Sequence, residues 1–129
     1  MNRVVLDTSV IIDHLRGKSQ HLHQLEQLQI ERELELLIPN IVITELFAGQ
    51  EAARDKPKQA LIKLINGYES VGLSKKSAIK AGELIRKYTQ IPDPFDFLIA
   101  AIAHEQQAQI ATHNQKHFRE IKEVSLYQF

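Results

Sequence analysis

Residues 4–6 restrict the fold of this chain more than any other feature. Three apolar side chains, Val-Val-Leu, run without a break up to Asp7, and such a run is typical of a buried strand of a parallel sheet that ends in a polar loop. Apolar residues at helical spacing follow directly after Asp7, so we expect Thr8 or Ser9 to cap a helix that ends near Gly17. The first strand therefore carries a carboxylate at its end.

Short apolar runs and stretches with helical spacing alternate along the rest of the chain. We expect strands at 36–38, 71–73 and 109–112, a possible edge strand at 124–126, and helices at 22–28, 41–53, 61–65, 74–88 and 96–103. This alternation predicts an α/β fold, a three-layer sandwich with a mostly parallel central sheet flanked by helices. Because we find no linker and no repeat, we expect a single domain over residues 1–129.

Composition narrows the kind of site the chain can carry. Sixteen Lys and Arg balance 16 Asp and Glu, so no overall positive field attracts nucleic acid. The absence of cysteine excludes disulfides, thiolate zinc sites and cysteine nucleophiles. No apolar run approaches the roughly 18 residues of a membrane span, and the first residues lack a signal-peptide pattern. We therefore expect a cytoplasmic protein, without membrane contact, whose site uses oxygen and imidazole.

Three acids lie at unusual places in this pattern. Asp7 ends an apolar strand, Glu45 interrupts an apolar helical face, and Asp96 begins the most apolar helix. Carboxylates that share a buried cavity repel one another, whereas a divalent cation favours their ionised form. Because hard oxygen ligands suit Mg²⁺ or Mn²⁺, we expect one of these ions to bind where the acids meet.

Four segments resemble, in order, the signature segments of the PIN-domain family, and in particular of VapC-like toxins. They are V-V-L-D-T-S-V-I-I-D, I-T-E-L-F-A-G, D-F-L-I-A-A and A-T-H-N-Q-K-H-F, which together span nearly the whole chain. The resemblance assigns the metal-binding acids to Asp7, Glu45 and Asp96. Asn114 takes the place at which many relatives have a further catalytic aspartate, and Thr112 matches the family's polar residue two positions earlier.

Several neighbouring residues have more than one interpretation. Asn114 offers a carbonyl oxygen without charge, which weakens a second metal position. Asp93, between Pro92 and Pro94 in an expected turn, either has a surface or capping role or supplies the missing charge, and we place the surface or capping role first. Thr8 and Ser9 either cap their helix or orient a carboxylate or water at the site.

The resemblance implies metal-dependent hydrolysis of an RNA phosphodiester by activated water, without a protein nucleophile. It also implies the toxin role in a toxin-antitoxin pair, neutralisation by a small antitoxin protein that covers the site, and a homodimer. The alternative is a weak or inactive PIN domain that serves as an RNA-binding or protein-binding module, because Asn114 replaces an acid.

Other site types fit less well. A haloacid-dehalogenase-like phosphatase needs a second Asp where Ser9 stands, and we cannot place the acidic pair and lysine of a receiver domain. The histidines show no zinc spacing, so we expect most, including His21 and His23, to be solvated. The helix at 74–88 is expected to bury a side that includes Ala78 and Ile85, and its lysines form either a phosphate-contacting patch or an ordinary solvated face.

Overall fold

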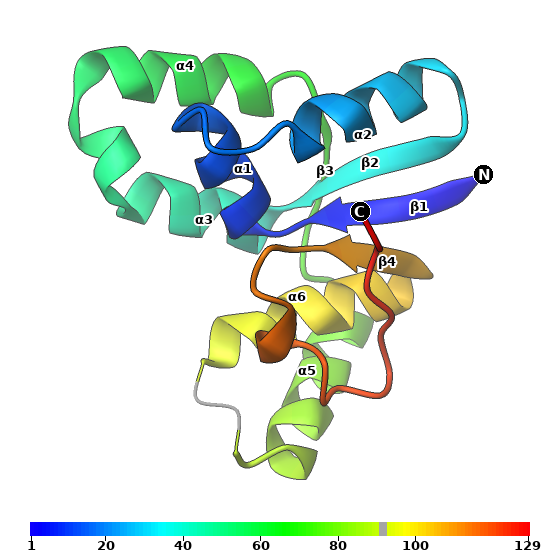
Figure 1. Ribbon diagram of the computed structural model, residues 1–129. Helices are drawn as coiled ribbons and strands as arrows, with labels where there is room; N and C mark the ends of the chain where they lie inside the picture. The colour runs from blue at the N-terminus through cyan, green and yellow to red at the C-terminus, as the bar shows by residue number, and fades with distance from the viewer. Residues whose placement is uncertain (91–92) are drawn as a thin grey trace.

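The computed structural model describes residues 1–90 and 93–129 and has one parallel sheet between layers of helices (Figure 1). The strands are β1 (Asn2–Leu6), β2 (Leu34–Pro39), β3 (Glu69–Val71) and β4 (Ala108–Ala111), in the spatial order β3-β2-β1-β4. The α-helices are α1 (Thr8–Leu15), α2 (His21–Ile30), α3 (Asn40–Ala48), α4 (Asp55–Ile65), α5 (Lys75–Lys87) and α6 (Pro94–Glu105). Short 3₁₀ helices follow at η1 (Gln50–Ala53) and η2 (Gln115–His117).

Helices α1, α2 and α4 lie on one side of the sheet, and α5 and α6 lie on the other (Figure 1). Strand β1 is central: Val5 pairs with Leu37 of β2 on one side and with Ile110 of β4 on the other. The predicted α/β sandwich is confirmed. Because β1 and β4 are parallel neighbours, the residues that follow them emerge side by side, and the Asp7 amide donates to the Ala111 carbonyl at 3.0 Å.

The core explains the apolar runs of the sequence. Val4, Val5 and Leu6 are completely buried because helices cover both faces of β1. Helix α6 is buried along Ile99–Ala103, as its nearly uniform apolar sequence indicated. Within the described part of the chain, no helix combines the length and the apolar character that a membrane crossing needs.

Some expected boundaries were wrong. The expected helix over 41–53 is broken at Gly49, whose extended backbone (φ −89°, ψ 178°) separates α3 from η1. In η1, Glu51 accepts a hydrogen bond from Arg16 Nε at 2.8 Å, which attaches this turn to the end of α1. The expected strand at 71–73 lies two residues earlier, at β3. The edge strand at 124–126 is reduced to one bridge, between Ile110 and Leu126.

Two helical details also differ. Asp7 occupies the N-cap position of α1 without a side-chain cap, so neither Thr8 nor Ser9 caps this helix. Helix α5 begins after Ser74, as expected, and a capping box closes its start, but its buried side was only partly predicted: Ala81 is buried, whereas Ala78 and Ile85 are exposed. The side chains that α5 buries are Ser77, Ala81 and Leu84. Packing against α6 therefore selects the buried side. Pro92, part of the expected turn, lies outside the described residues.

Candidate metal centre

Asp7 is fixed at the carboxyl end of β1 by hydroxyl groups. The residue is 5% exposed, and its Oδ2 accepts hydrogen bonds from Thr112 Oγ1 at 2.7 Å and from Ser9 Oγ at 2.9 Å. Ser9 Oγ in turn accepts the His113 amide at 2.9 Å. The loops after β1 and β4 thus hold one oxygen of Asp7 and set the orientation of its carboxylate.

Glu45 reaches the same region from the half-buried side of α3. Its Oε1 accepts a hydrogen bond from Thr8 Oγ1 at 3.1 Å. Thr8 and Ser9, consecutive residues at the start of α1, therefore each hold a different acid. Of the two interpretations of these residues, the structure supports contact with the carboxylates and excludes side-chain capping of α1.

The start of α6 supplies two further carboxylates. Asp96 lies in the first turn and is 6% exposed. Asp93 has the capping role that we placed first, because its Oδ1 accepts the Phe95 amide at 2.9 Å. Its charge also acts on the acids around it, so the two interpretations of Asp93 do not exclude each other.

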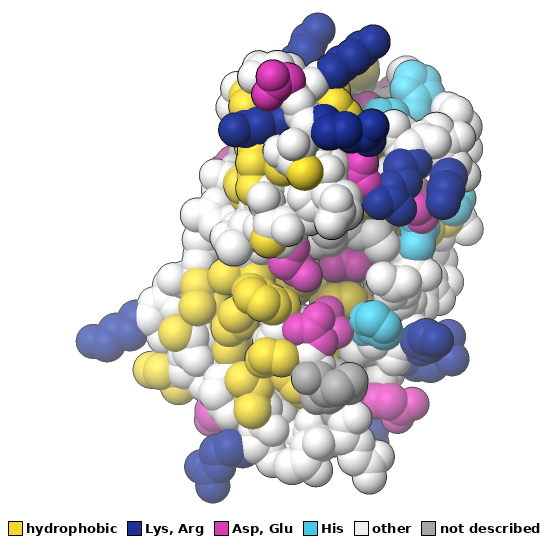
Figure 2. Space-filling model, turned by 90° about the vertical axis from the view of Figure 1, so that its left-hand side faces the viewer, with side chains coloured by type: hydrophobic (Ala, Val, Ile, Leu, Met, Phe, Trp, Pro, Cys, Tyr) yellow, Lys and Arg dark blue, Asp and Glu magenta, His cyan; other side chains and the backbone are white. Residues whose placement is uncertain are grey.

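Acids that are far apart in the sequence affect one another's pKa in the folded protein. Burial raises the pKa of Asp96 from 3.8 to about 7, with further contributions from the negative charges of Asp93, Asp7 and Glu45. Burial also raises the pKa of Glu45 above its ordinary value of 4.5, against the hydrogen bond from Thr8 and together with Asp7 and Asp93. Figure 2 shows acidic side chains gathered at the middle of one face, with a histidine beside them.

Among the described residues, little positive charge lies near Asp7, Glu45, Asp93 and Asp96, which we call the acidic group. Among residues 1–90 and 93–129, the basic group within ion-pair distance of Asp7, Glu45, Asp93 or Asp96 is His117, whose Nδ1 is 3.3 Å from Asp96 Oδ2. The negative charge of each acid raises the free energy that is needed to ionise its neighbours. A bound cation would remove that cost, and carboxylate oxygens are the donors that Mg²⁺ and Mn²⁺ prefer. The residues present therefore fit a divalent ion.

The acidic side chains approach one another without converging on a single point. Within the described residues, no three His, Asp or Glu side chains already form a set able to hold a metal ion. Their negative charges repel one another, so a divalent cation would be needed to bring their oxygens together.

Asn114, the residue at the fourth acidic position, makes a different contribution. Its backbone amide donates to Thr112 Oγ1 at 2.9 Å, and the residue is exposed at the start of η2. Thr112, which is 1% exposed, thus joins the Asn114 backbone to Asp7. Among the described residues, no hydrogen bond fixes the Asn114 side chain, so its amide can turn toward or away from the acids.

The histidines make more contacts than the sequence predicted, because we expected most of them to be solvated. His117 contacts Asp96, and His113 Nδ1 pairs with Asp13. His21, expected to be solvated, has its Nδ1 2.9 Å from His113 Nε2 and stacks on Phe129 with ring centroids 4.0 Å apart. The signal in the sequence was the position of His113 and His117 within the fourth signature segment. His23 is exposed, as predicted.

Comparison with known proteins agrees with this architecture. The family model described as "PIN domain" matches residues 4–124. Ribonuclease VapC19 of Mycobacterium tuberculosis is 31% identical over 117 residues, which cover 88% of this chain and 90% of that protein. The chain belongs to the PIN-domain family. Within that family, its sequence is similar to the VapC ribonucleases.

Solved structures show the same fold over nearly the whole chain. VapBC2 from Rickettsia felis, bound to a DNA fragment from its promoter, includes a chain with a TM-score of 0.81 and 26% identity, and 98% of each chain is covered. DNA-bound VapBC from Salmonella typhimurium gives a TM-score of 0.82 at 21% identity, again with 98% of each chain covered. The loops that carry Asp7, Asp93 and Asn114 therefore extend from a scaffold shared with these proteins.

Proposed function

We propose that this chain is one PIN domain that acts as a metal-dependent endoribonuclease, the toxin of a toxin-antitoxin pair in the cytoplasm. The observation that carries the proposal is the gathering of Asp7, Glu45, Asp93 and Asp96 at the carboxyl end of a parallel sheet, where burial and the neighbouring negative charges raise the pKa of Asp96. Similarity to a protein named as a VapC ribonuclease supports RNA as the substrate.

The residues have distinct roles in this proposal. Asp7, Glu45 and Asp96 hold Mg²⁺ or Mn²⁺, and Thr8, Ser9 and Thr112 orient the carboxylates through their hydroxyl groups. When bound, a divalent ion activates water and stabilises negative charge on phosphate oxygens. Asp93 adds negative charge to the site, and the Asn114 amide is available to contact substrate.

Wild-type protein, purified free of any antitoxin, is expected to cleave a structured RNA in Mg²⁺ or Mn²⁺. EDTA should stop the reaction, because the acids then lack the cation that polarises water and phosphate. Single-turnover cleavage of an end-labelled RNA measures both effects. Cleavage that continues undiminished in EDTA would contradict metal dependence. Absence of cleavage with both Mg²⁺ and Mn²⁺ would contradict ribonuclease activity.

The toxin role implies a protein partner. Structurally similar chains come from VapBC2 of Rickettsia felis and from a toxin-antitoxin complex of Klebsiella pneumoniae. In our proposal, an antitoxin segment covers the acidic group and presents an Arg to it, because a guanidinium pairs with two carboxylate oxygens at once. A short gene for a DNA-binding protein next to this one is the expected genomic arrangement.

We also propose a homodimer, in which exposed apolar side chains of α5 and α6 lie at the interface. Ile79 and Ile85 are 61% and 42% exposed, and Phe95 is 39% exposed. Figure 2 shows hydrophobic side chains gathered beside the acidic group. Exposed apolar side chains of this kind are available for association with another protein surface.

The double variant Ile79→Lys/Ile85→Lys is therefore expected to be a monomer, because it places two charges in an apolar interface. Light scattering after size exclusion measures the mass. Ile30→Lys is the matched control, since Ile30 is 73% exposed on α2, on the opposite side of the sheet, and this variant should remain a dimer. A monomeric wild type, or a dimeric double variant, would reject this interface.

A second candidate function is an inactive PIN domain that binds RNA or protein. The observation in its favour is Asn114, exposed and uncharged where many relatives carry an acid. The two candidates differ in the effect of Asn114→Asp, which activates an inactive module but is not needed for cleavage by an enzyme.

A further inference from the structure

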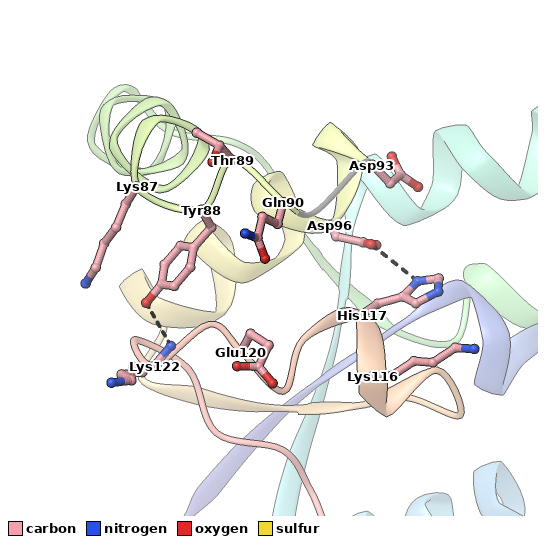
Figure 3. Close-up of a pocket in the computed structure, with 10 residues that line it drawn as sticks. All are labelled: Lys87, Tyr88, Thr89, Gln90, Asp93, Asp96, Lys116, His117, Glu120 and Lys122. Atoms are coloured by element: carbon pink, nitrogen blue, oxygen red, sulfur yellow. Dashed lines mark hydrogen bonds and ion pairs between the residues drawn. The ribbon is translucent and has the colours of Figure 1, made fainter.

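A cavity adjoins the acidic group at Asp93 and Asp96. Its volume is about 720 Å³, and Asp96 forms part of its wall. The end of α5 and the residues after it form one side, the start of α6 forms the second, and η2 with the following segment forms the third (Figure 3). Pockets of about 300–1,000 Å³ hold small organic ligands, so one nucleotide fits this space.

The third side of the cavity carries positive charge. Lys116 and Lys122 are both exposed, and among the described residues no ion pair engages either ammonium group. Lys87, across the cavity, is 2.8 Å from Glu123 and is therefore already compensated. Glu120 lies between Lys116 and Lys122 (Figure 3). Once a cation compensates Asp93 and Asp96, the remaining charge favours an anion.

Hydrogen bonds and an ion pair hold the side of the cavity that carries Lys116 and Lys122 in place. The Tyr88 hydroxyl donates to Glu123 Oε1 at 2.7 Å and accepts the Lys122 amide at 3.1 Å, so α5 positions the backbone at Lys122. His117, next to Lys116, is held by its contact with Asp96. Gln90 projects an amide into the cavity (Figure 3), and an amide both donates and accepts, as contact with a base edge requires.

We propose that this cavity is a subsite for single-stranded RNA. In this subsite, the nucleotide next to the scissile phosphate lies between Gln90 and the side of the cavity that carries Lys116 and Lys122. Lys116 and Lys122 contact phosphate groups of the strand, and Gln90 contacts the base. This subsite deepens the ribonuclease function proposed above and rests on it. We expect a duplex not to enter, because a nucleotide must leave its base pair to lie in the cavity.

The test measures binding separately from cleavage. A short 5′-fluorescent RNA without secondary structure is titrated with protein in the presence of Ca²⁺, so that a divalent cation compensates Asp93 and Asp96, and anisotropy gives the affinity at salt concentrations from about 50 to 200 mM. Lys116→Gln/Lys122→Gln should weaken binding about tenfold at the lowest salt, and the slope of log affinity against log salt should fall by about 1.4, at about 0.7 for each lost phosphate contact to a single strand.

The matched control is Lys75→Gln/Lys76→Gln, which removes the same charge from the far end of α5, within the basic face that sequence analysis offered as a rival phosphate contact. This control should keep the wild-type slope. Glu120→Gln should act in the opposite direction and tighten binding about twofold, because it removes a negative charge between the two lysines. A duplex of the same sequence should bind the Lys116→Gln/Lys122→Gln protein and the wild type alike.

The outcomes separate this inference from the proposed function. Equal losses in the two double variants, or an unchanged slope in Lys116→Gln/Lys122→Gln, would overturn the subsite. Equal weakening for duplex and single strand would overturn it as well. If the slope falls as expected while the wild type cleaves no RNA in Mg²⁺ or Mn²⁺, the subsite stands and the ribonuclease proposal fails.

Discussion

Asp7→Asn is expected to lower RNA cleavage by more than about 100-fold, since loss of residues that merely support metal ligands already costs about 10- to 100-fold. The substitution removes a charged ligand from the site but keeps the shape of a side chain that Ser9 and Thr112 hold in place. Single-turnover cleavage in Mn²⁺ measures the loss. Asp55→Asn, an exposed acid at the start of α4, is the control and should cleave as the wild type does.

Asn114 variants measured in the same assay separate an enzyme from an inactive module. Asn114→Asp should keep or raise activity, because it adds a charged ligand at a second metal position. Asn114→Ala should cost less than Asp7→Asn, because a neutral amide contributes less to ion binding than a carboxylate. An inactive wild type that Asn114→Asp activates would make the natural protein a binding module. Activity that survives Asp7→Asn would contradict the metal site itself.

The metal-free protein is expected to be more stable at pH 5 than at pH 8. Asp96 loses its proton near pH 3.8 in the unfolded chain and near pH 7 in the folded protein. Between these values the native state binds a proton that the unfolded state lacks, so stability falls as pH rises and the loss is complete above about pH 7. One pKa unit corresponds to about 1.36 kcal/mol. Allowing for water at the site, we expect a loss of about 2 kcal/mol.

Urea unfolding in EDTA at several pH values measures this loss. Asp96→Asn should remove most of the pH dependence and be more stable than the wild type at pH 8 without metal, whereas Asp55→Asn should retain the wild-type profile. Mn²⁺ at 100 times its Kd should stabilise the wild type at pH 8 by about 2.7 kcal/mol through mass action. A metal-free profile that is flat from pH 5 to pH 8, or the same melting temperature with and without Mn²⁺, would contradict the electrostatic account of the site.

The sequence by itself determined the fold class and the candidate acids. Uninterrupted apolar residues predict strands buried on both faces, and the helical spacing between them predicts the covering helices, because each signal depends on neighbouring residues alone. Asp7 and Asp96 could be singled out because each lies next to an apolar element, which is a property of the local sequence. Their proposed role as ligands came from the family resemblance together with the chemistry of carboxylates.

Only the tertiary structure decided how these residues are held and what surrounds them. Thr112 contacts Asp7 across 105 residues of sequence, and His117 meets Asp96 because η2 packs beside the start of α6. The buried side of α5 and the break at Gly49 likewise depend on packing against other elements. Such contacts depend on how folded elements approach one another in space, and the periodicity of a single helix or strand carries no information about its neighbours.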